Sequence, residues 1–302
     1  MTVFSSPAKI NLFLRVVGRR ADGRHEIETV FQRLDWGDRL RIEAADVPGL
    51  ELVCRGETVD CGPEENLVTR AFHALCGRSG ETEKPRGARV VLDKEIPVGG
   101  GLGGGSSNAA ATLLGLNQVF GLGVAPDTLA QIALSLGADV PFFLGPPCAI
   151  GRGVGEKLTP VPSGKDYWAL LALPEFGVST AEVYADYDAT QALARDNPAS
   201  DGRNSSAPEL EDLLQALLCD NLDNALALMH NSLEAAAFHV APKLALLHAQ
   251  LESLAEQPVR VTGSGATLFT LARTKDESER LAGVWEGVTE VRIARFEVTS
   301  RS

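Results

Sequence analysis

Residues Pro97–Ala111 read PVGGGLGGGSSNAAA, with six glycines in the seven positions from Gly99 to Gly105. Each glycine costs about 0.5–1 kcal/mol relative to alanine in an ordered element. A run this dense is therefore favoured only where the backbone must approach a ligand very closely. Phosphate is the ligand this pattern indicates, because loop amides and a helix N-terminus bind anions. The apolar spacing behind the loop predicts a helix beginning near Ser107.

Two nucleotide-binding patterns explain the loop less well. A Walker P-loop ends in Gly-Lys-Ser/Thr, whereas residues 106–108 read Ser-Ser-Asn. Gly99, Gly101 and Gly104 match G-x-G-x-x-G, but in a segment this rich in glycine the match is nearly automatic. A dinucleotide fold also requires a strand after the helix, and a second helix follows here, starting at Pro126.

The remaining interpretations are a phosphate site and a glycine hinge. In the first, Ser106, Ser107 and Asn108 add side-chain donors or a metal contact to the loop amides. In the second, the glycines only provide mobility, and Ser107 or Asn108 is an ordinary N-cap. The conformational cost of six glycines favours the phosphate site.

Composition restricts the partners. The chain has 302 residues, enough for two domains, and a net charge of -12, which argues against nucleic acid and anionic membranes as partners. The N-terminus is too short and too charged in its apolar stretch for a signal peptide or membrane span. Five scattered cysteines without a C-x-x-C pair predict neither disulfides nor a zinc site, and favour the cytoplasm: Cys54, Cys61, Cys76, Cys148 and Cys219.

Apolar and polar residues alternate from Ala8 to Leu14, which predicts a half-buried strand with Lys9 and Asn11 on one face. The chain thus begins with antiparallel strands over 8–14, 25–34 and around Leu40 and Ile42, joined by turns at 21–23 and 36–38. A helix from about Asn66, a strand over 88–96 and two helices surround the glycine loop.

A domain boundary is expected near Pro160, giving domains 1–159 and 160–302. The second part is expected to be an α+β layer with helices on an antiparallel sheet. Its predicted elements are exposed helix and loop over 187–211, helices over 213–255, a strand, glycine turn and strand from Val259, a helix through Trp285 and a strand over 291–298.

Lys9 and Asp139 are candidates for chemistry. By itself, Lys9 is more often a solvated residue on the open face of a sheet, and Asp139 is as readily a helix cap before Pro141. As a pair, however, a partly desolvated Asp139 would accept a proton from a hydroxyl, and Lys9 would keep it ionised. Phosphoryl transfer to an alcohol needs such a pair beside a phosphate site.

Four segments resemble, in order and spacing, the motifs of the GHMP small-molecule kinases. They are the stretch from Pro7 to Asp38, PVGGGLGGGSSNAAATL from Pro97, GADVPFFL from Gly137 and VTGSGATLF from Val261. The first segment resembles the branch that phosphorylates diphosphocytidyl methylerythritol in non-mevalonate isoprenoid synthesis. The resemblance implies a two-domain α+β fold, with a ribosomal-protein-S5-like ATP-binding domain, a ferredoxin-like domain and the active site in the cleft between them. It also implies that the enzyme uses ATP with Mg²⁺, although it does not assign the metal ligands. We expect the chain to be a monomer or a weak dimer.

The resemblance further implies roles for individual residues. Asp139 would be the catalytic base toward the erythritol 2-hydroxyl, and Lys9 its charged partner. Asn66, Leu67 and Lys94 would surround the adenosine, and the phosphates would lie on Pro97, Gly99, Gly100, Gly101, Gly103, Gly104, Gly105, Ser106, Ser107 and Asn108.

For the substrate, the resemblance implies a cytosine held by His25, with Tyr184 on the opposite face and Thr180 nearby. Arg24 stands where the family has an aromatic residue, and its guanidinium can stack on a ring or pair with a diphosphate. The remaining substrate contacts would come from Asn11 and from Gly263, Ser264 and Gly265 in the GSGA turn.

Two other functions stay open at this point. Another GHMP-type kinase, acting on a different alcohol, would explain Arg24 by a different substrate head group. A nucleotide-binding regulator would keep the glycine loop, but it would need neither Lys9 nor Asp139. ATP consumption that depends on the diphosphocytidyl substrate separates these possibilities.

Overall fold

The computed structural model describes residues 1–58, 62–76, 86–162, 165–196 and 208–298, so Cys61 and part of the 187–211 stretch lie outside it. A seven-stranded sheet has the order β3-β4-β2-β1-β8, with β5 pairing to β2 and β6 to β5. Its strands are β1 (Thr2–Arg19), β2 (His25–Ala45), β3 (Gly49–Gly56), β4 (Gly87–Lys94), β5 (Cys148–Gly153), β6 (Lys157–Pro160) and β8 (His230–Asn231). Three helices and a 3₁₀ helix pack with it: α1 (Leu67–Cys76), α2 (Gly104–Val119), α3 (Pro126–Leu136) and η1 (Val140–Leu144).

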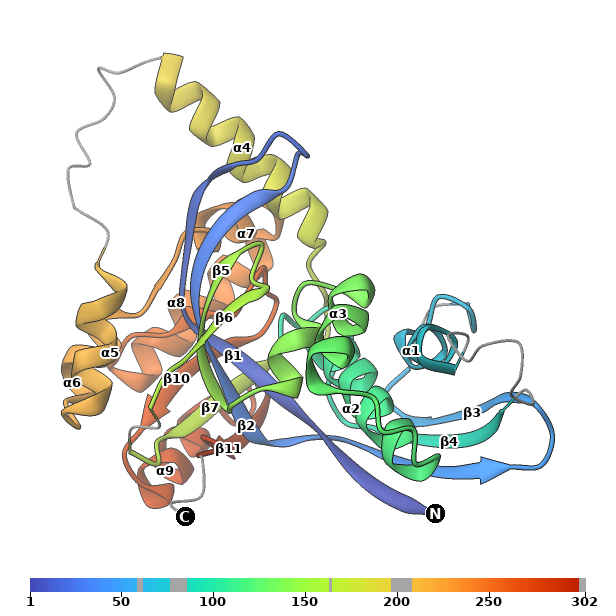
Figure 1. Cartoon of the computed structure of the whole chain (residues 1–302). Helices are drawn as coiled ribbons and strands as arrows, with labels where there is room; N and C mark the ends of the chain where they lie inside the picture. The colour runs from blue at the N-terminus through green and yellow to red at the C-terminus, as the bar shows by residue number, and fades with distance from the viewer. Residues whose placement is uncertain (59–61, 77–85, 163–164, 197–207, 299–302) are drawn as a thin grey trace.

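A four-stranded antiparallel sheet of order β11-β7-β10-β9 forms the second layer. Its strands are β7 (Trp168–Leu173), β9 (Arg260–Val261), β10 (Leu268–Ala272) and β11 (Glu290–Arg295). The helices of this part are α4 (Thr180–Asp196), α5 (Leu210–Leu218), α6 (Leu222–Leu228), α7 (Glu234–Val240), α8 (Pro242–Ala255) and α9 (Lys275–Trp285). Figure 1 shows α1–α3 grouped with β3 and β4 on one side, and α5–α9 grouped around β7, β10 and β11 on the other.

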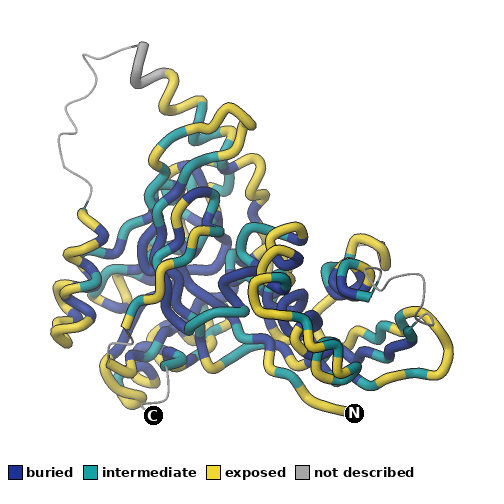
Figure 2. Tube along the Cα trace, viewed as in Figure 1, coloured by how far each residue is buried: buried dark blue, intermediate teal, exposed yellow. Residues whose placement is uncertain are grey.

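The β1–β2 hairpin joins the two parts. β1 pairs antiparallel with β2 along its length and parallel with β8, a two-residue strand from the second half of the chain. A buried cluster draws on both halves, including Ile10 of β1 and Phe269 of β10. Figure 2 shows this buried interior continuing from the hairpin into the second layer, while the hairpin tip is exposed. The turn predicted at 21–23 is confirmed as this tip.

The turn predicted at 36–38 is wrong, because β2 continues through these residues to Ala45. Gly37 and Asp38 pair with Pro7 and Ser6 on β1. A Cβ on Gly37 would lie 2.3 Å from the carbonyl oxygen of Ser6, so glycine is needed here for close strand approach rather than for a turn.

The other predicted elements are largely confirmed. The strand, glycine turn and strand after Val259 are β9 and β10, and α9 ends at Trp285 as expected. The helix behind the glycine loop begins at Gly104, three residues before its predicted start. Within the described part of the chain, every helix is too short or too polar to cross a membrane.

Candidate active site

The glycine loop forms one wall of a cavity of about 330 Å³ between β4, α1 and α2. Most of the residues expected around ATP line this cavity, and Ser107 does not. The lining members of that set are Asn66, Leu67, Lys94, Pro97, Gly99, Gly100, Gly101, Gly103, Gly104, Gly105, Ser106 and Asn108.

Backbone geometry explains the glycines. Gly103 has a φ of 70°, the left-handed conformation that glycine favours, and immediately precedes α2. A Cβ at Gly103 would also lie 2.9 Å from the Phe143 ring and 3.0 Å from Cγ of Lys9. The N–H of Ser107 donates to the Gly103 carbonyl at 2.9 Å, so the N–H groups of residues 104–106 precede this first helical hydrogen bond. These amides at a helix N-terminus fit a phosphate group.

Asp38 fixes the strand that leads into the loop. One carboxylate oxygen accepts hydrogen bonds from the backbone N–H groups of Glu95 and Ile96, at 2.7 and 2.8 Å. The other accepts from Lys94 Nζ at 2.7 Å and from Asn108 Nδ2 at 2.8 Å. The carboxylate is fully buried. It therefore connects β2, β4 and α2 behind the cavity.

Three residues that were expected to contact ATP have side chains that are bonded to protein groups or buried. Asn108 Nδ2 donates to Ser6 and Asp38, so its amide hydrogens bind protein oxygens rather than a phosphate. Lys94 Nζ is likewise bonded to Asp38 and to the Ile96 carbonyl, at 2.7 Å each. Ser107 is buried within the helix, and its Oγ has no hydrogen-bond partner among the residues that the structure describes. The N-cap role considered for Ser107 or Asn108 is wrong, because Gly103 holds that position.

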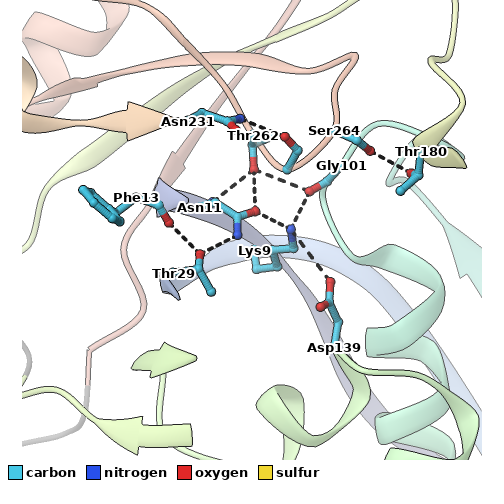
Figure 3. A network of polar contacts seen from close by, with 11 residues as sticks. Lys9, Asn11, Phe13, Thr29, Gly101, Asp139, Thr180, Asn231, Thr262 and Ser264 are labelled. Atoms are coloured by element: carbon cyan, nitrogen blue, oxygen red, sulfur yellow. Dashed lines mark hydrogen bonds and ion pairs between the residues drawn. The ribbon is translucent and has the colours of Figure 1, made fainter. Parts of the chain in front are cut away.

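Lys9 is buried, so the interpretation as a solvated surface residue is wrong. Its Nζ donates to Asn11 Oδ1 at 2.6 Å and to the Gly101 carbonyl at 2.7 Å, which confirms that Lys9 and Asn11 share a face (Figure 3). Register shifts in the β1–β2 pairing flank both residues, and such bulges redirect side chains. Burial lowers the pKa of Lys9, and the charge of Asp139 opposes this shift.

Asp139 lies directly before η1, and its side chain makes no capping hydrogen bond. Its Oδ2 is 3.9 Å from Lys9 Nζ, and the side chain is 35% exposed. The carboxylate is thus accessible to a ligand while it faces the buried ammonium (Figure 3). This geometry suits proton transfer from a bound hydroxyl better than capping.

The GSGA turn approaches the same centre from the second half of the chain. Thr262 Oγ1 accepts a hydrogen bond from the Asn11 N–H at 3.0 Å. Asn231 Nδ2 donates to the carbonyls of Val261 and Gly263, at 2.7 and 2.8 Å. Ser264 bonds to Thr180 at 2.7 Å (Figure 3). Gly263 and Gly265 have φ values of 59° and 92°, which favour glycine in this turn.

A second cavity, of about 480 Å³, lies between the hairpin tip and α4. Arg24, His25 and Tyr184 line it, whereas Thr180 does not. The rings of His25 and Tyr184 stack with centroids 4.6 Å apart, so a base does not fit between them in this conformation. Burial raises the pKa of Tyr184 to about 12, and the nearby charge of Asp139 adds to this shift.

The sequence did not reveal what holds His25. Its Nε2 lies 2.7 Å from Asp188 Oδ1 on α4, and Arg19 pairs with the same carboxylate at 3.3 Å. Arg24 Nε lies 3.5 Å from Asp22, and the Arg24 side chain is 68% exposed at the cavity rim. His25 therefore does not have both ring nitrogens available for a base edge.

Four residues of the site were missed in the sequence: Asp38, Asp188, Asn231 and Thr262. Gly37 and Asp38 predict a turn locally, but Asp38 also falls in the same alternation as the apolar residues Leu34, Trp36, Leu40 and Ile42, and that alternation was the available signal. Asn231 and Thr262 act through contacts between distant segments, which no local pattern shows. Among the described residues, no group of three or more His, Cys, Asp and Glu side chains could hold a metal ion.

Comparison with known proteins identifies the fold and the family of this chain. Residues 66–145 match the GHMP kinase N-terminal domain. The structure resembles the crystal structure of a 4-(cytidine 5'-diphospho)-2C-methyl-D-erythritol kinase, with a TM-score of 0.76 and 33% identity over 99% of this chain and 100% of that one. Mevalonate kinase of L. major has the same fold at 14% identity, with a TM-score of 0.76 over 100% of this chain and 97% of that one. The chain is therefore a phosphotransferase of the GHMP kinase class, the predicted α+β fold is confirmed, and ATP is its expected phosphate donor.

Sequence relatives narrow the class. The 4-diphosphocytidyl-2-C-methyl-D-erythritol kinase of Moorella thermoacetica is 38% identical over 285 residues, 93% of this chain and 94% of the relative. That of Shewanella loihica is 38% identical over 280 residues, 93% and 88% of the two chains. That of Pseudomonas paraeruginosa is 44% identical over 214 residues, 68% and 72%. The chain belongs to the 4-diphosphocytidyl-2-C-methyl-D-erythritol kinase family.

Proposed function

We propose that this enzyme transfers the γ-phosphate of ATP to the 2-hydroxyl of 4-diphosphocytidyl-2-C-methyl-D-erythritol, within the non-mevalonate isoprenoid pathway. One observation carries the proposal. The Lys9 ammonium is bonded to the glycine loop through the Gly101 carbonyl and lies 3.9 Å from the accessible Asp139 carboxylate. The chemical pair therefore adjoins the phosphate-binding loop, and Ala138, the neighbour of Asp139, lines the second cavity.

In the proposed reaction, Asp139 accepts the hydroxyl proton as the hydroxyl oxygen attacks the γ-phosphorus. The bond from that phosphorus to the β,γ-bridging oxygen breaks, and ADP leaves. The Lys9 ammonium lies beside Asp139 and faces the charge that develops on the transferred phosphoryl group. The N–H groups of residues 104–106 hold the phosphates of the nucleotide.

Mg²⁺ belongs to the proposal as the ion that accompanies ATP and neutralises phosphate charge. Such an ion needs few protein ligands, because it binds through one or two protein oxygens together with the phosphates. Ser106, in the first turn of α2, lines the cavity, so its hydroxyl is placed to supply such an oxygen, whereas the Ser107 Oγ is buried away from the cavity.

The remaining site assignments are part of the same proposal. The cavity beside α1 would take the adenosine between Asn66, Leu67 and Lys94. The cavity at the hairpin tip would take the diphosphocytidyl group beside Arg24, His25 and Tyr184, and Asn11 with residues 263–265 would border the erythritol. We place the boundary between the two domains near Pro160.

The quaternary state and location are also proposed. A monomer or weak dimer is consistent with a Lys9–Asp139 centre assembled within one chain, as the 3.9 Å contact between these residues illustrates. A cytoplasmic location rests on the scattered cysteines and on substrates that belong to central metabolism.

The test is ADP release with and without the diphosphocytidyl substrate, with ³¹P NMR of the product. We expect release to require the substrate and a new phosphomonoester to form on the erythritol. Release that requires a different alcohol would indicate another small-molecule kinase. ATP binding without turnover on any alcohol would indicate a regulator.

A further inference from the structure

Thr262 lies where the second half of the chain meets the Lys9 centre. Its side chain is buried in the turn between β9 and β10. Oγ1 accepts the Asn11 N–H at 3.0 Å, and its proton faces Asn11 Oδ1 and the Gly101 carbonyl, each 3.4 Å away. These two oxygens are the acceptors that Lys9 Nζ uses at 2.6 and 2.7 Å (Figure 3).

Lys9 and Thr262 thus share the same two acceptors, one on β1 and one on the glycine loop. An ammonium group has three N–H donors. Because two of them are bound to these oxygens, the positions of the oxygens set the direction of the third, which faces Asp139 at 3.9 Å. Any shift of Asn11 or Gly101 would therefore turn the ammonium away from the reacting groups.

We propose that Thr262 is a positioning residue for Lys9: its hydroxyl holds the two oxygens that bind the ammonium and so directs the third N–H toward Asp139. Thr262 is itself held firmly. Its backbone N–H donates to the Thr267 carbonyl at 3.1 Å, and its carbonyl accepts from Gly265 at 3.0 Å. Asn231 fixes the residues on either side, Val261 and Gly263.

The contact with the glycine loop is equally tight. A Cβ at Gly101 would lie only 2.2 Å from the Thr262 carbonyl oxygen, so the loop and the turn are in direct backbone contact. The positioning role follows from this arrangement, because a rigid turn from one half of the chain sets the distance between a strand and a loop of the other half. The inference rests on the proposed role of Lys9.

The variant Thr262→Val removes the hydroxyl and keeps the shape. We expect kcat to fall about tenfold or more, because small displacements of reacting groups have large effects on rate, while KM for ATP changes less than about twofold. The hydrogen bonds stabilise the charged form of Lys9, so their loosening lowers the Lys9 pKa and moves the alkaline limb of the pH–rate profile to lower pH. Asp139 is the charged group that faces Lys9 among the described residues. Thr262→Ser, which keeps the hydroxyl, should restore the wild-type profile.

Thr270→Val is the matched control. Thr270 is also fully buried in this layer, on β10, and its hydroxyl bonds to the Pro258 carbonyl at 2.8 Å and to Gln257 at 2.7 Å, away from Lys9. Its loss should lower the melting temperature without moving the pH profile. If Thr262→Val does not yield folded enzyme, the comparison of Thr262→Ser with Thr262→Ala carries the test, since only alanine should show the shifted limb.

A Lys9 variant distinguishes a failure of the positioning role of Thr262 from a failure of the proposed role of Lys9. Lys9→Met is assayed beside them, and an active Lys9→Met enzyme would refute the proposed role of Lys9 itself. If Lys9→Met is inactive while Thr262→Val keeps the wild-type kcat and pH profile and loses only thermal stability, as Thr270→Val does, the positioning role is overturned and the proposed function stands.

Discussion

Asp38→Asn tests whether the buried carboxylate behind the glycine loop organises the ATP site. Asparagine can still accept the N–H groups of Glu95 and Ile96 through its oxygen. Its amide nitrogen, however, would face Lys94 Nζ and Asn108 Nδ2, which are both donors. Of the two partners of Lys94 within the described part of the chain, the Ile96 carbonyl would remain for a buried charge.

The expected loss of stability follows from the burial of both partners, since the side chains of Asp38 and Lys94 are 0% and 3% exposed. Removing one member of such a pair costs about 3–5 kcal/mol, a large part of a total stability of about 5–15 kcal/mol. We expect a loss of this size in urea unfolding and a raised KM for ATP, because β4 and α2 lose their common anchor.

Two comparisons make the test specific. Asp93 directly precedes Lys94 in the sequence, and Asp93→Asn removes a partly exposed ion pair with Arg41 at 2.6 Å. This variant should lose only about 0–1 kcal/mol of stability. Combining Asp38→Asn with Lys94→Met should cost less than the sum of the single variants, because the pair is removed together. A stability loss for Asp38→Asn within about 1 kcal/mol of the Asp93→Asn value, with an unchanged KM for ATP, would refute the reasoning.

Four further predictions concern the reacting groups and the two cavities. Asp139→Asn should reduce kcat by about 10²–10⁴ with little change in melting temperature; an active but destabilised variant would make Asp139 a structural residue. Gly105→Val should raise the KM for ATP in an ADP-release assay without unfolding the protein, since a Cβ there meets nothing closer than Leu67 at 3.4 Å; unchanged kinetics would favour the hinge interpretation. Tyr184→Ala should weaken binding of the diphosphocytidyl substrate by about 1–3 kcal/mol in calorimetry, and the wild type should use the cytidine form far better than the uridine form; equal use of both would refute base recognition. The alkaline limb of kcat/KM for ATP should lie at lower pH than that of kcat, and coincident limbs would place the titrating group away from the nucleotide.

The fold was predictable where the signal is local. Alternating residues around Lys9, the apolar helical spacing after Gly105 and the glycine turn at Gly263 each predicted their element. The prediction of a turn at 36–38 was wrong because Gly37 and Asp38 together are typical of a turn. In the structure, Gly37 allows the backbone to approach Ser6 closely, and the buried Asp38 carboxylate binds Lys94. Contacts with residues distant in sequence determine the conformation of this segment, and a local sequence pattern does not contain that information.

The same difference between local sequence signals and contacts of distant residues applies to the site. The glycine loop, Lys9 and Asp139 were singled out by residue type and spacing, which point to phosphate and proton transfer, and the structure brings the three together. The hydrogen bonds that hold the site together were not predicted, because Asp38, Asp188 and Thr262 bind partners that lie 56, 163 and 251 positions away in the sequence. The stack of His25 on Tyr184 was also unexpected, and a bound base must contact an outer face of this pair or separate it.

The buried position of Lys9 carries a desolvation cost, and the proposed binding of a nucleotide beside it would offset that cost. Burial lowers the Lys9 pKa from 10.5, and the Asp139 charge only opposes this effect across 3.9 Å. Between the lowered pKa and 10.5 the unfolded chain binds the extra proton, so Lys9 reduces stability below this window and the penalty is relieved as pH rises through it. Phosphate groups held by the neighbouring loop would add negative charge beside the ammonium and raise its pKa again. The alkaline limb of kcat/KM reports the free enzyme and that of kcat the loaded one, and the difference between the two limbs would therefore measure how strongly bound ATP stabilises the charged form of Lys9.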